Sequence, residues 1–258
     1  MLVLPAPPAL TLIRQADHAA LAGQLVRAWR RPTALPPGAR DRLILAVDHH
    51  DDGWALAERK PVLDTDGRPL DFAHIPTDQH VTIWRRSVDL AADRDPYVGL
   101  LVAHHARHLY TTTRIGAEDN PAIAQAFITE LALRIVRCSE PLALGDAEDQ
   151  LACDPRCVIL ARRLLSFFDG LSLALCGAIG WHFAAEPVAF ADTQATMTLV
   201  PRGDDAVTVA PWPFEGDELV VTVPAAQVPD EAYADADAFA RTWQHAPVAE
   251  LRRRLHPA

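Results

Sequence analysis

The chain has little basic charge and almost no lysine. Its 258 residues carry 34 acidic and 24 basic side chains, which gives a formal net charge of −10, and Lys60 is the only lysine. Proteins that bind DNA or RNA usually carry a basic patch, so this balance argues against a nucleic-acid partner. The remaining basic residues are arginines, whose planar guanidinium groups are well suited to binding phosphate.

Cysteine is also scarce. The four cysteines are Cys138, Cys153, Cys157 and Cys176. The C-x-x-x-C spacing of Cys153 and Cys157 lacks the second ligand pair that a structural zinc site needs. We therefore expect free, buried thiols in a reducing cytosol.

Several other signals are missing. The first residues, MLVLPAPPALTLI, have no basic start and contain prolines, so they do not indicate a signal peptide. The apolar stretch 158–179 is about long enough to span a bilayer, but Arg162, Arg163 and Asp169 inside it favour a buried core helix. The sequence contains neither a Gly-rich phosphate loop nor the nucleophile elbow of a serine hydrolase. We expect a cytoplasmic protein that does not contact a membrane.

Helical signals dominate the first two thirds of the chain. Apolar periodicity, caps and breakers predict helices over 15–31 and 41–54, from 78, from 96, over 121–138 and from 155. Runs rich in Val and Thr at 197–201, 206–212 and 218–224 predict an antiparallel meander, and a last helix is predicted over 234–255. The expected fold is mostly α, with strands mainly at 190–225 and a short strand or arm at 1–14. We expect two units, residues 1–187 and 188–258.

Histidine and aspartate recur in a pattern that suits a metal. His18 comes first, the adjacent pair His50 and Asp51 follows, and Asp169 lies far downstream. Imidazoles and carboxylates are the side chains that hold divalent transition metals or magnesium. Neighbouring helix positions point about 100° apart, so His50 and Asp51 can reach one ion only from the edge of a buried face.

The local phase supports this placement. His50 continues the apolar stripe of Leu43 and Val47, and His18 continues that of Leu21 and Leu25. Asp169 interrupts the run LLSFFDGLSL. An isolated buried carboxylate costs several kcal/mol or more unless it is paired or binds a metal. Asp169 therefore needs a partner.

The remaining histidines are harder to interpret. His104, His105 and His108 lie within one helical turn, and phase alone does not separate them as ligands or exclude a solvated basic face. His49 lies on another helical phase, and Asp52 is expected at the helix end with an orienting role as an alternative. We assign no role to a scattered set: His74, His80, His182, His245 and His256.

The order of these residues resembles the HD domain, a helical superfamily named for its His-Asp pair and found in metal-dependent phosphohydrolases and some di-iron oxygenases. More narrowly, the chain resembles the uncharacterised bacterial family named domain of unknown function 3891. The segments that carry the resemblance are QADHAALAGQL, HDDGW, IWRRSVDLAA, DPYVGLLVAHHARHLY, FFDGLSLAL and PWPF. The resemblance implies an HD-like helical bundle with a small C-terminal antiparallel β meander, and it favours His105 within the histidine cluster.

The resemblance implies a metal site formed by His18, His50, Asp51, His105 and Asp169, holding one or two divalent ions of iron, manganese, magnesium or zinc. The first hypothesis is a hydrolase acting on a small phosphorylated metabolite through a metal-activated water, with catalytic roles for Asp51 and for Arg107, which would balance the charge of the leaving group. A di-iron oxygenase and a non-catalytic metal-binding sensor or scaffold domain are the alternatives. The expected partner is a small, anionic substrate.

Overall fold

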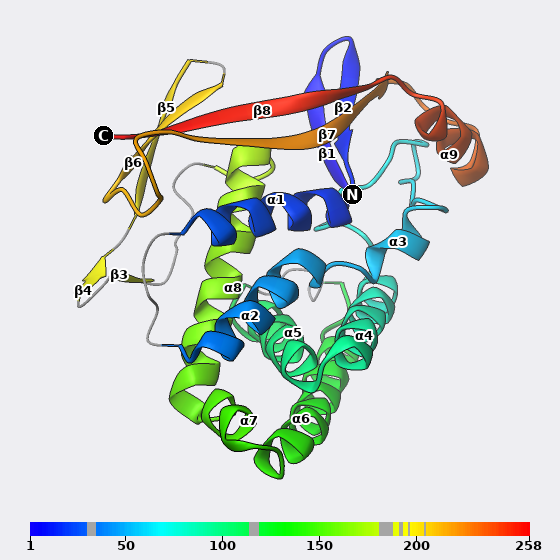
Figure 1. Ribbon diagram of the computed structural model, residues 1–258. Coiled ribbons are helices and arrows are strands. Elements are labelled where there is room, and N and C mark those ends of the chain that lie inside the picture. Colours follow the sequence, from blue (N-terminus) through cyan, green and yellow to red (C-terminus); the bar gives the residue numbers. More distant parts are fainter. Residues whose placement is uncertain (30–34, 114–118, 181–187, 191–192, 196, 204) are drawn as a thin grey trace.

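The computed structural model describes residues 1–29, 35–113, 119–180, 188–190, 193–195, 197–203 and 205–258 (Figure 1). The α-helices are α1 Gln15–Ala28, α2 Pro37–His49, α3 Trp54–Ala57, α4 Thr77–Arg94, α5 Pro96–His108, α6 Pro121–Ala143, α7 Ala147–Ala152, α8 Pro155–Cys176 and α9 Ala236–Gln244, and a π-helical turn, Leu109–Thr113, continues α5. The strands are β1 Leu2–Ala6, β2 Ala9–Ile13, β3 Val188–Phe190, β4 Thr193–Ala195, β5 Thr198–Arg202, β6 Ala206–Ala210, β7 Leu219–Pro229 and β8 Val248–Pro257.

Three of the central helices begin with the same device, an acidic or amide N-cap followed by proline. Asp95, Asn120 and Asp154 cap α5, α6 and α8, and each side chain accepts hydrogen bonds from backbone N–H groups of the first turn. The proline that follows each cap has no N–H to satisfy and a backbone angle that suits a helix start. These helix starts agree with the sequence prediction.

The predicted fold class is wrong in its β component. The chain is 55% helical but devotes 20% of its residues to strands, six of which form one mixed, curled sheet. The strand order is β1-β2-β7-β8-β6-β5, and every neighbouring pair is antiparallel except β6 and β8. This sheet extends across one side of the helices (Figure 1), so the protein is not a helical bundle with a small meander.

Two errors at the ends of the chain explain the difference. Residues 234–255 were predicted to form one helix, but α9 ends at Gln244 and β8 then pairs with β7 over eight residues of register. The N-terminal residues form a β1–β2 hairpin that joins β7. Strand pairing over such sequence separations leaves little local signal. The expected boundary at residue 187 lies outside the described residues.

Side-chain hydrogen bonds fix two helices to the sheet. The amide of Gln24 on α1 donates to the carbonyl of Thr222 on β7 at 2.9 Å and accepts from its N–H at 3.1 Å. Arg253 on β8 donates its Nε–H to the carbonyl of Leu175, near the end of α8, at 2.9 Å. The sheet thus determines where α1 and α8 lie relative to each other.

The prediction of free, buried thiols is confirmed in part. All four cysteines are free thiols; Cys138 and Cys176 are buried, whereas Cys153 and Cys157 are half-buried. Among the described residues, no helix combines the length and apolarity needed to cross a membrane. The segment around Asp169 instead forms the buried face of α8.

The His-Asp pair lies at a turn, not inside a helix as predicted. α2 ends at His49, and the chain then turns into α3. This turn packs closely on α4, because Gly53 donates its N–H to the hydroxyl of Ser87 at 3.1 Å. A Cβ atom at Gly53 would lie 2.4 Å from the carbonyl oxygen of Ile83 and 2.6 Å from the backbone nitrogen of Ser87.

We therefore expect Gly53→Ala to lower the free energy of unfolding by about 1–3 kcal/mol, the usual cost of overpacking against backbone. Gly180→Ala is the matched control, since a Cβ atom there meets nothing within 4 Å. Urea denaturation of both variants measures the difference. Equal stability of the two would show that the turn has room to relax.

Candidate metal centre

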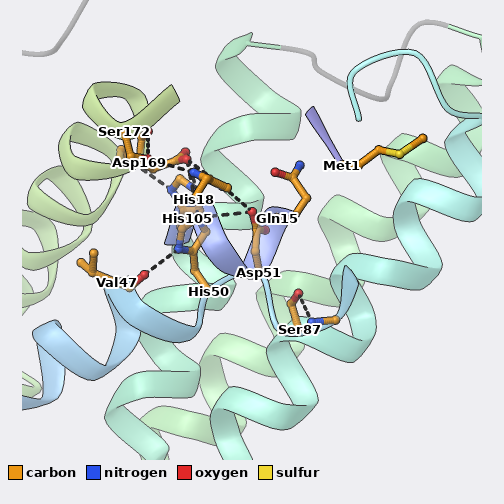
Figure 2. A network of polar contacts seen from close by, with 12 residues as sticks. Met1, Gln15, His18, Val47, His50, Asp51, Ser87, His105, Asp169 and Ser172 are labelled. Atoms are coloured by element: carbon orange, nitrogen blue, oxygen red, sulfur yellow. Dashed lines mark hydrogen bonds and ion pairs between the residues drawn. The ribbon is translucent and has the colours of Figure 1, made fainter. Parts of the chain in front are cut away.

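Five predicted site residues converge in the interior (Figure 2). His18 comes from α1, His50 and Asp51 from the turn that follows α2, His105 from α5 and Asp169 from α8. All five are buried, with exposed fractions between 0% and 9%. The structure therefore brings together residues up to 151 positions apart in the sequence, as the residue order predicts.

The tips of these side chains are separated by distances that suit one shared ion. Nε2 of His50 lies 3.5 Å from Oδ2 of Asp51 and 3.5 Å from Oδ1 of Asp169. Nε2 of His18 lies 2.8 Å from Oδ2 of Asp51 and 3.9 Å from Oδ1 of Asp169, and Nε2 of His105 lies 3.3 Å from Oδ2 of Asp169. Ligands that each sit roughly 2 Å from one ion are themselves about 3 Å apart.

Hydrogen bonds on the far side of His18 fix its tautomer. The hydroxyl of Ser172 donates its single proton to the carbonyl of Asp169 at 2.8 Å. The same oxygen lies 2.8 Å from Nδ1 of His18, so it accepts there and Nδ1 carries a hydrogen. In the neutral ring, Nε2 then directs a lone pair toward Asp51, so a proton or a metal ion is needed between the two acceptors.

His50 is oriented in the same way. Its Nδ1 lies 2.9 Å from the carbonyl of Val47, which can only accept, so Nδ1 is the protonated nitrogen. Within the described part of the chain, Nε2 of His50, Nε2 of His105 and Oδ1 of Asp51 are buried and make no hydrogen bond. Unpaired buried polar atoms are costly. Histidines whose outer nitrogen is held by the protein while the inner one is unpaired are typical of metal sites.

The donor set therefore fits a divalent ion. Two overlapping groups, His18–His50–Asp51 and His50–His105–Asp169, each have ligand atoms within 4.8 Å of one another. The mixture of imidazole and carboxylate is compatible with zinc, manganese or iron. His50 belongs to both groups.

The electrostatics of the centre couple all five groups. Burial favours the neutral form of Asp51, but His50 and His18 outweigh it and hold its pKa below the usual range. Burial also favours the neutral form of Asp169, but His105 and His50 outweigh it and hold the pKa of Asp169 below the usual range. Burial would lower the pKa of His50, yet Asp51, Asp169 and the Val47 carbonyl raise it to about 9. Burial lowers the pKa of His105, which stays neutral.

Other predicted residues lie outside the centre. His104 and His108 are half-buried on α5, and neither belongs to the two ligand groups. His49 contacts Asp52 at 3.1 Å, and Asp52 also pairs with Arg94 at 2.6 Å. Within the described chain, the carboxylate of Asp52 makes these two ion pairs and none with a histidine of the candidate centre.

Arg107 is exposed and does not line the cavity beside the centre. It follows His105 by two positions, roughly 200° around the helix. The structure therefore places Arg107 on the opposite side of α5 from the ligands.

Sequence reasoning missed His80. It is 1% exposed, lines the cavity beside Asp51, and its Nδ1 lies 2.6 Å from the hydroxyl of Tyr110. Burial lowers the pKa of His80 to about 4, so the ring is neutral at pH 7. One signal was present in the sequence: His80 precedes Trp84 by four positions and so shares the buried stripe of α4.

The cavity beside the centre is small and largely apolar. Its volume is about 30 Å³, enough for one or two water-sized groups. Besides the ligands, its wall includes Trp54, Phe72, Trp84, Leu109 and Leu173. Arginine and lysine do not occur among the described residues that line it.

The sequence was compared with known proteins. The model of one family, described as a protein of unknown function (DUF3891), matches residues 1–230. The chain belongs to this family. Searches of curated proteins and of solved structures each found no match.

The raised pKa of His50 predicts how the stability of the metal-free protein depends on pH. A histidine with a folded pKa of about 9 and an unfolded pKa of about 6.5 stabilises the fold fully below pH 6.5 and loses that contribution as the pH rises toward 9. Between pH 6.5 and 8.5 we expect the free energy of unfolding to fall by on the order of 2 kcal/mol. Denaturant titrations with a chelator present measure it.

Protein saturated with metal provides the comparison. Metal binding displaces protons from its ligands, so the decline should vanish or reverse over the same pH range. A metal-free protein whose stability stays constant from pH 6.5 to 8.5 would contradict the charge assignment of His50.

The histidine cluster gives a second prediction. We expect His105→Gln to weaken metal binding at least tenfold, because it removes the buried nitrogen beside Asp169, while His104→Gln changes it less than twofold. Competition with a chromogenic chelator measures both affinities. The reverse order would assign the ligand to His104.

Proposed function

We propose that this chain is a metal-dependent hydrolase that acts on a small phosphorylated metabolite. The observation that carries the proposal is the convergence of five buried imidazole and carboxylate groups. Three of their inner atoms, Nε2 of His50, Nε2 of His105 and Oδ1 of Asp51, make no hydrogen bond within the described chain. The residue order resembles that of the HD superfamily, and this resemblance supports the proposed hydrolase. The expected substrate class also comes from this resemblance.

Each residue of the centre has a separate role in this proposal. His18, His50, Asp51 and Asp169 would hold the ion, with His105 as a further ligand. A bound divalent ion lowers the pKa of a coordinated water and polarises a phosphoryl oxygen. Ser172 and the Val47 carbonyl keep the two imidazoles in the ligating tautomer. His80 adds a neutral ring on the cavity wall that can hydrogen-bond a water or a substrate oxygen.

Arg107 has no part in this proposal, because it is exposed on the far face of α5. The described residues that line the cavity include no arginine or lysine. The bound ion itself would therefore have to balance the negative charge of a phosphate, and the surrounding aromatic groups would exclude water.

A second candidate, a di-iron oxygenase, is favoured by one observation. The two ligand groups overlap, so the centre has enough donors for two ions, and its apolar, cation-free wall suits a small neutral co-substrate such as dioxygen. Metal identity and stoichiometry distinguish this candidate from the hydrolase.

The test uses Asp51→Asn, with Asp52→Asn as the matched control on the next residue. Elemental analysis of protein purified without added metal should give one or two ions per chain for the wild type and for Asp52→Asn. Asp51→Asn should lose at least nine tenths of its metal, because it removes a ligand charge while leaving the size of the side chain unchanged. Hydrolysis of para-nitrophenyl phosphate should fall in parallel.

Three outcomes contradict the proposal in different ways. Metal retained by Asp51→Asn would mean that Asp51 is no ligand and pairs only with His18 and His50. Two irons per chain without phosphatase activity would support the oxygenase. Bound metal with no turnover of para-nitrophenyl phosphate and no consumption of dioxygen would support a sensor or scaffold role.

A further inference from the structure

A second cavity shares the Trp54 wall with the metal centre. Its volume is about 270 Å³, and it is lined by residues of the segment 53–62, by Leu70 and Ile75, and by the outer face of α4. This is several times the volume beside the metal ligands, and it approaches the lower end of the range for small-molecule sites, roughly 300 Å³. Trp54 lines both cavities.

The inner surface of this second cavity is apolar. Trp54, Ile75 and Ile83 form a small buried cluster separate from the main core, with Val62 and Leu70 packed against it. These side chains line the cavity instead of closing it. Leu56 at its edge is 55% exposed. Covering an open apolar surface of this kind with an aliphatic chain removes it from water and lowers the free energy.

The rim of the cavity carries cations without partners. Lys60 and Arg86 both line the cavity and are exposed, and neither makes an ion pair with any residue that the structure describes. Glu58 and the N-terminal ammonium of Met1 are also in the wall, but they pair with each other at 3.0 Å. The buried carboxylate of Glu58 also accepts a hydrogen bond from the N–H of Gln15 at 2.9 Å. Asp78 lies in the first turn of α4, where the helix dipole offsets its charge.

We propose that this cavity binds a small amphipathic anion, of which a medium-chain aliphatic carboxylate is the class that fits. The aliphatic chain lies against Ile75, Ile83 and Val62, and the carboxylate lies at the rim between Lys60 and Arg86. The proposal goes beyond the proposed hydrolase, because none of these residues is a metal ligand and binding needs no metal.

Trp54 connects this cavity to the metal centre. The backbone N–H of Trp54 donates to the backbone carbonyl of Asp51 at 3.0 Å, and the centroid of its ring lies 5.8 Å from that of His80. The indole is 3% exposed, and its Nε1 has no hydrogen-bond partner in the described chain. A ligand in the second cavity therefore lies against a side chain that also forms the wall beside Asp51.

The experiment is isothermal titration calorimetry of the full chain with sodium octanoate, in the presence of a chelator. Octanoate should bind, acetate should show no heat because it lacks the chain, and octanol should bind at least threefold more weakly because it lacks the charge. Octyl phosphate distinguishes a carboxylate site from a general anion site. Because metal is removed throughout, failure of the metal proposal does not affect this result.

Variants locate the site. The double change Lys60→Gln with Arg86→Gln should weaken octanoate three- to tenfold, whereas Arg59→Gln, an exposed neighbour outside this cavity, should leave it unchanged. Thr82→Trp, an exposed position of α4 on the cavity wall, should abolish binding by filling the space. Octanoate that binds Thr82→Trp as tightly as the wild type, or octanol that binds as tightly as octanoate, would overturn the proposal.

Discussion

The structure depends on the pairing of two buried carboxylates with three buried imidazoles. Asp51 and Asp169 sit among apolar helices, where an isolated carboxylate costs several kcal/mol or more. Each is instead within 3.5 Å of a histidine nitrogen. No single helix contains this arrangement. Because the charges must be compensated locally, α1, α2, α5 and α8 can only pack in registers that bring the five tips together.

The curled sheet also helps to hold these groups together. Gln24 ties α1 to β7, and Arg253 ties the end of α8 to β8. Those two helices carry His18 and Asp169, which lie 3.9 Å apart at their nearest ligand atoms. Displacement of either helix by one turn, about 5.4 Å, would separate them. The sheet is therefore part of the scaffold that holds the centre, and not an appendage to a helical bundle.

The sequence predicted the features that depend on local interactions, and it missed those that depend on contacts between residues far apart in the chain. Apolar periodicity and N-caps are local signals, and they placed α1, α4, α5, α6 and α8 and the buried faces of His18 and Asp169. The strand β8 depends on pairing with β7, and the apolar positions of 248–257 alone did not distinguish it from a helix. His80 was missed for a similar reason, since its partner Tyr110 lies 30 positions away. His105 was separable from His104 by family resemblance, and the structure adds that its ring is the one fully buried.

The size of the inner cavity restricts the possible substrates more than the identity of the surrounding side chains does. A space of about 30 Å³ holds one or two waters, but it does not hold a phosphorylated metabolite beside them. A hydrolase of this architecture must move part of its wall to admit substrate, whereas an enzyme that used dioxygen would need less movement. Trp54 is the wall residue with space behind it, since the second cavity of about 270 Å³ adjoins it. Rotation of its indole toward that space would enlarge the inner cavity without moving the five buried histidine and aspartate side chains, so occupancy of the second cavity would oppose substrate entry. Inhibition of phosphatase activity by octanoate that weakens in the Lys60→Gln, Arg86→Gln double variant, which leaves the cavity open, would show this coupling; equal inhibition of both proteins would exclude it.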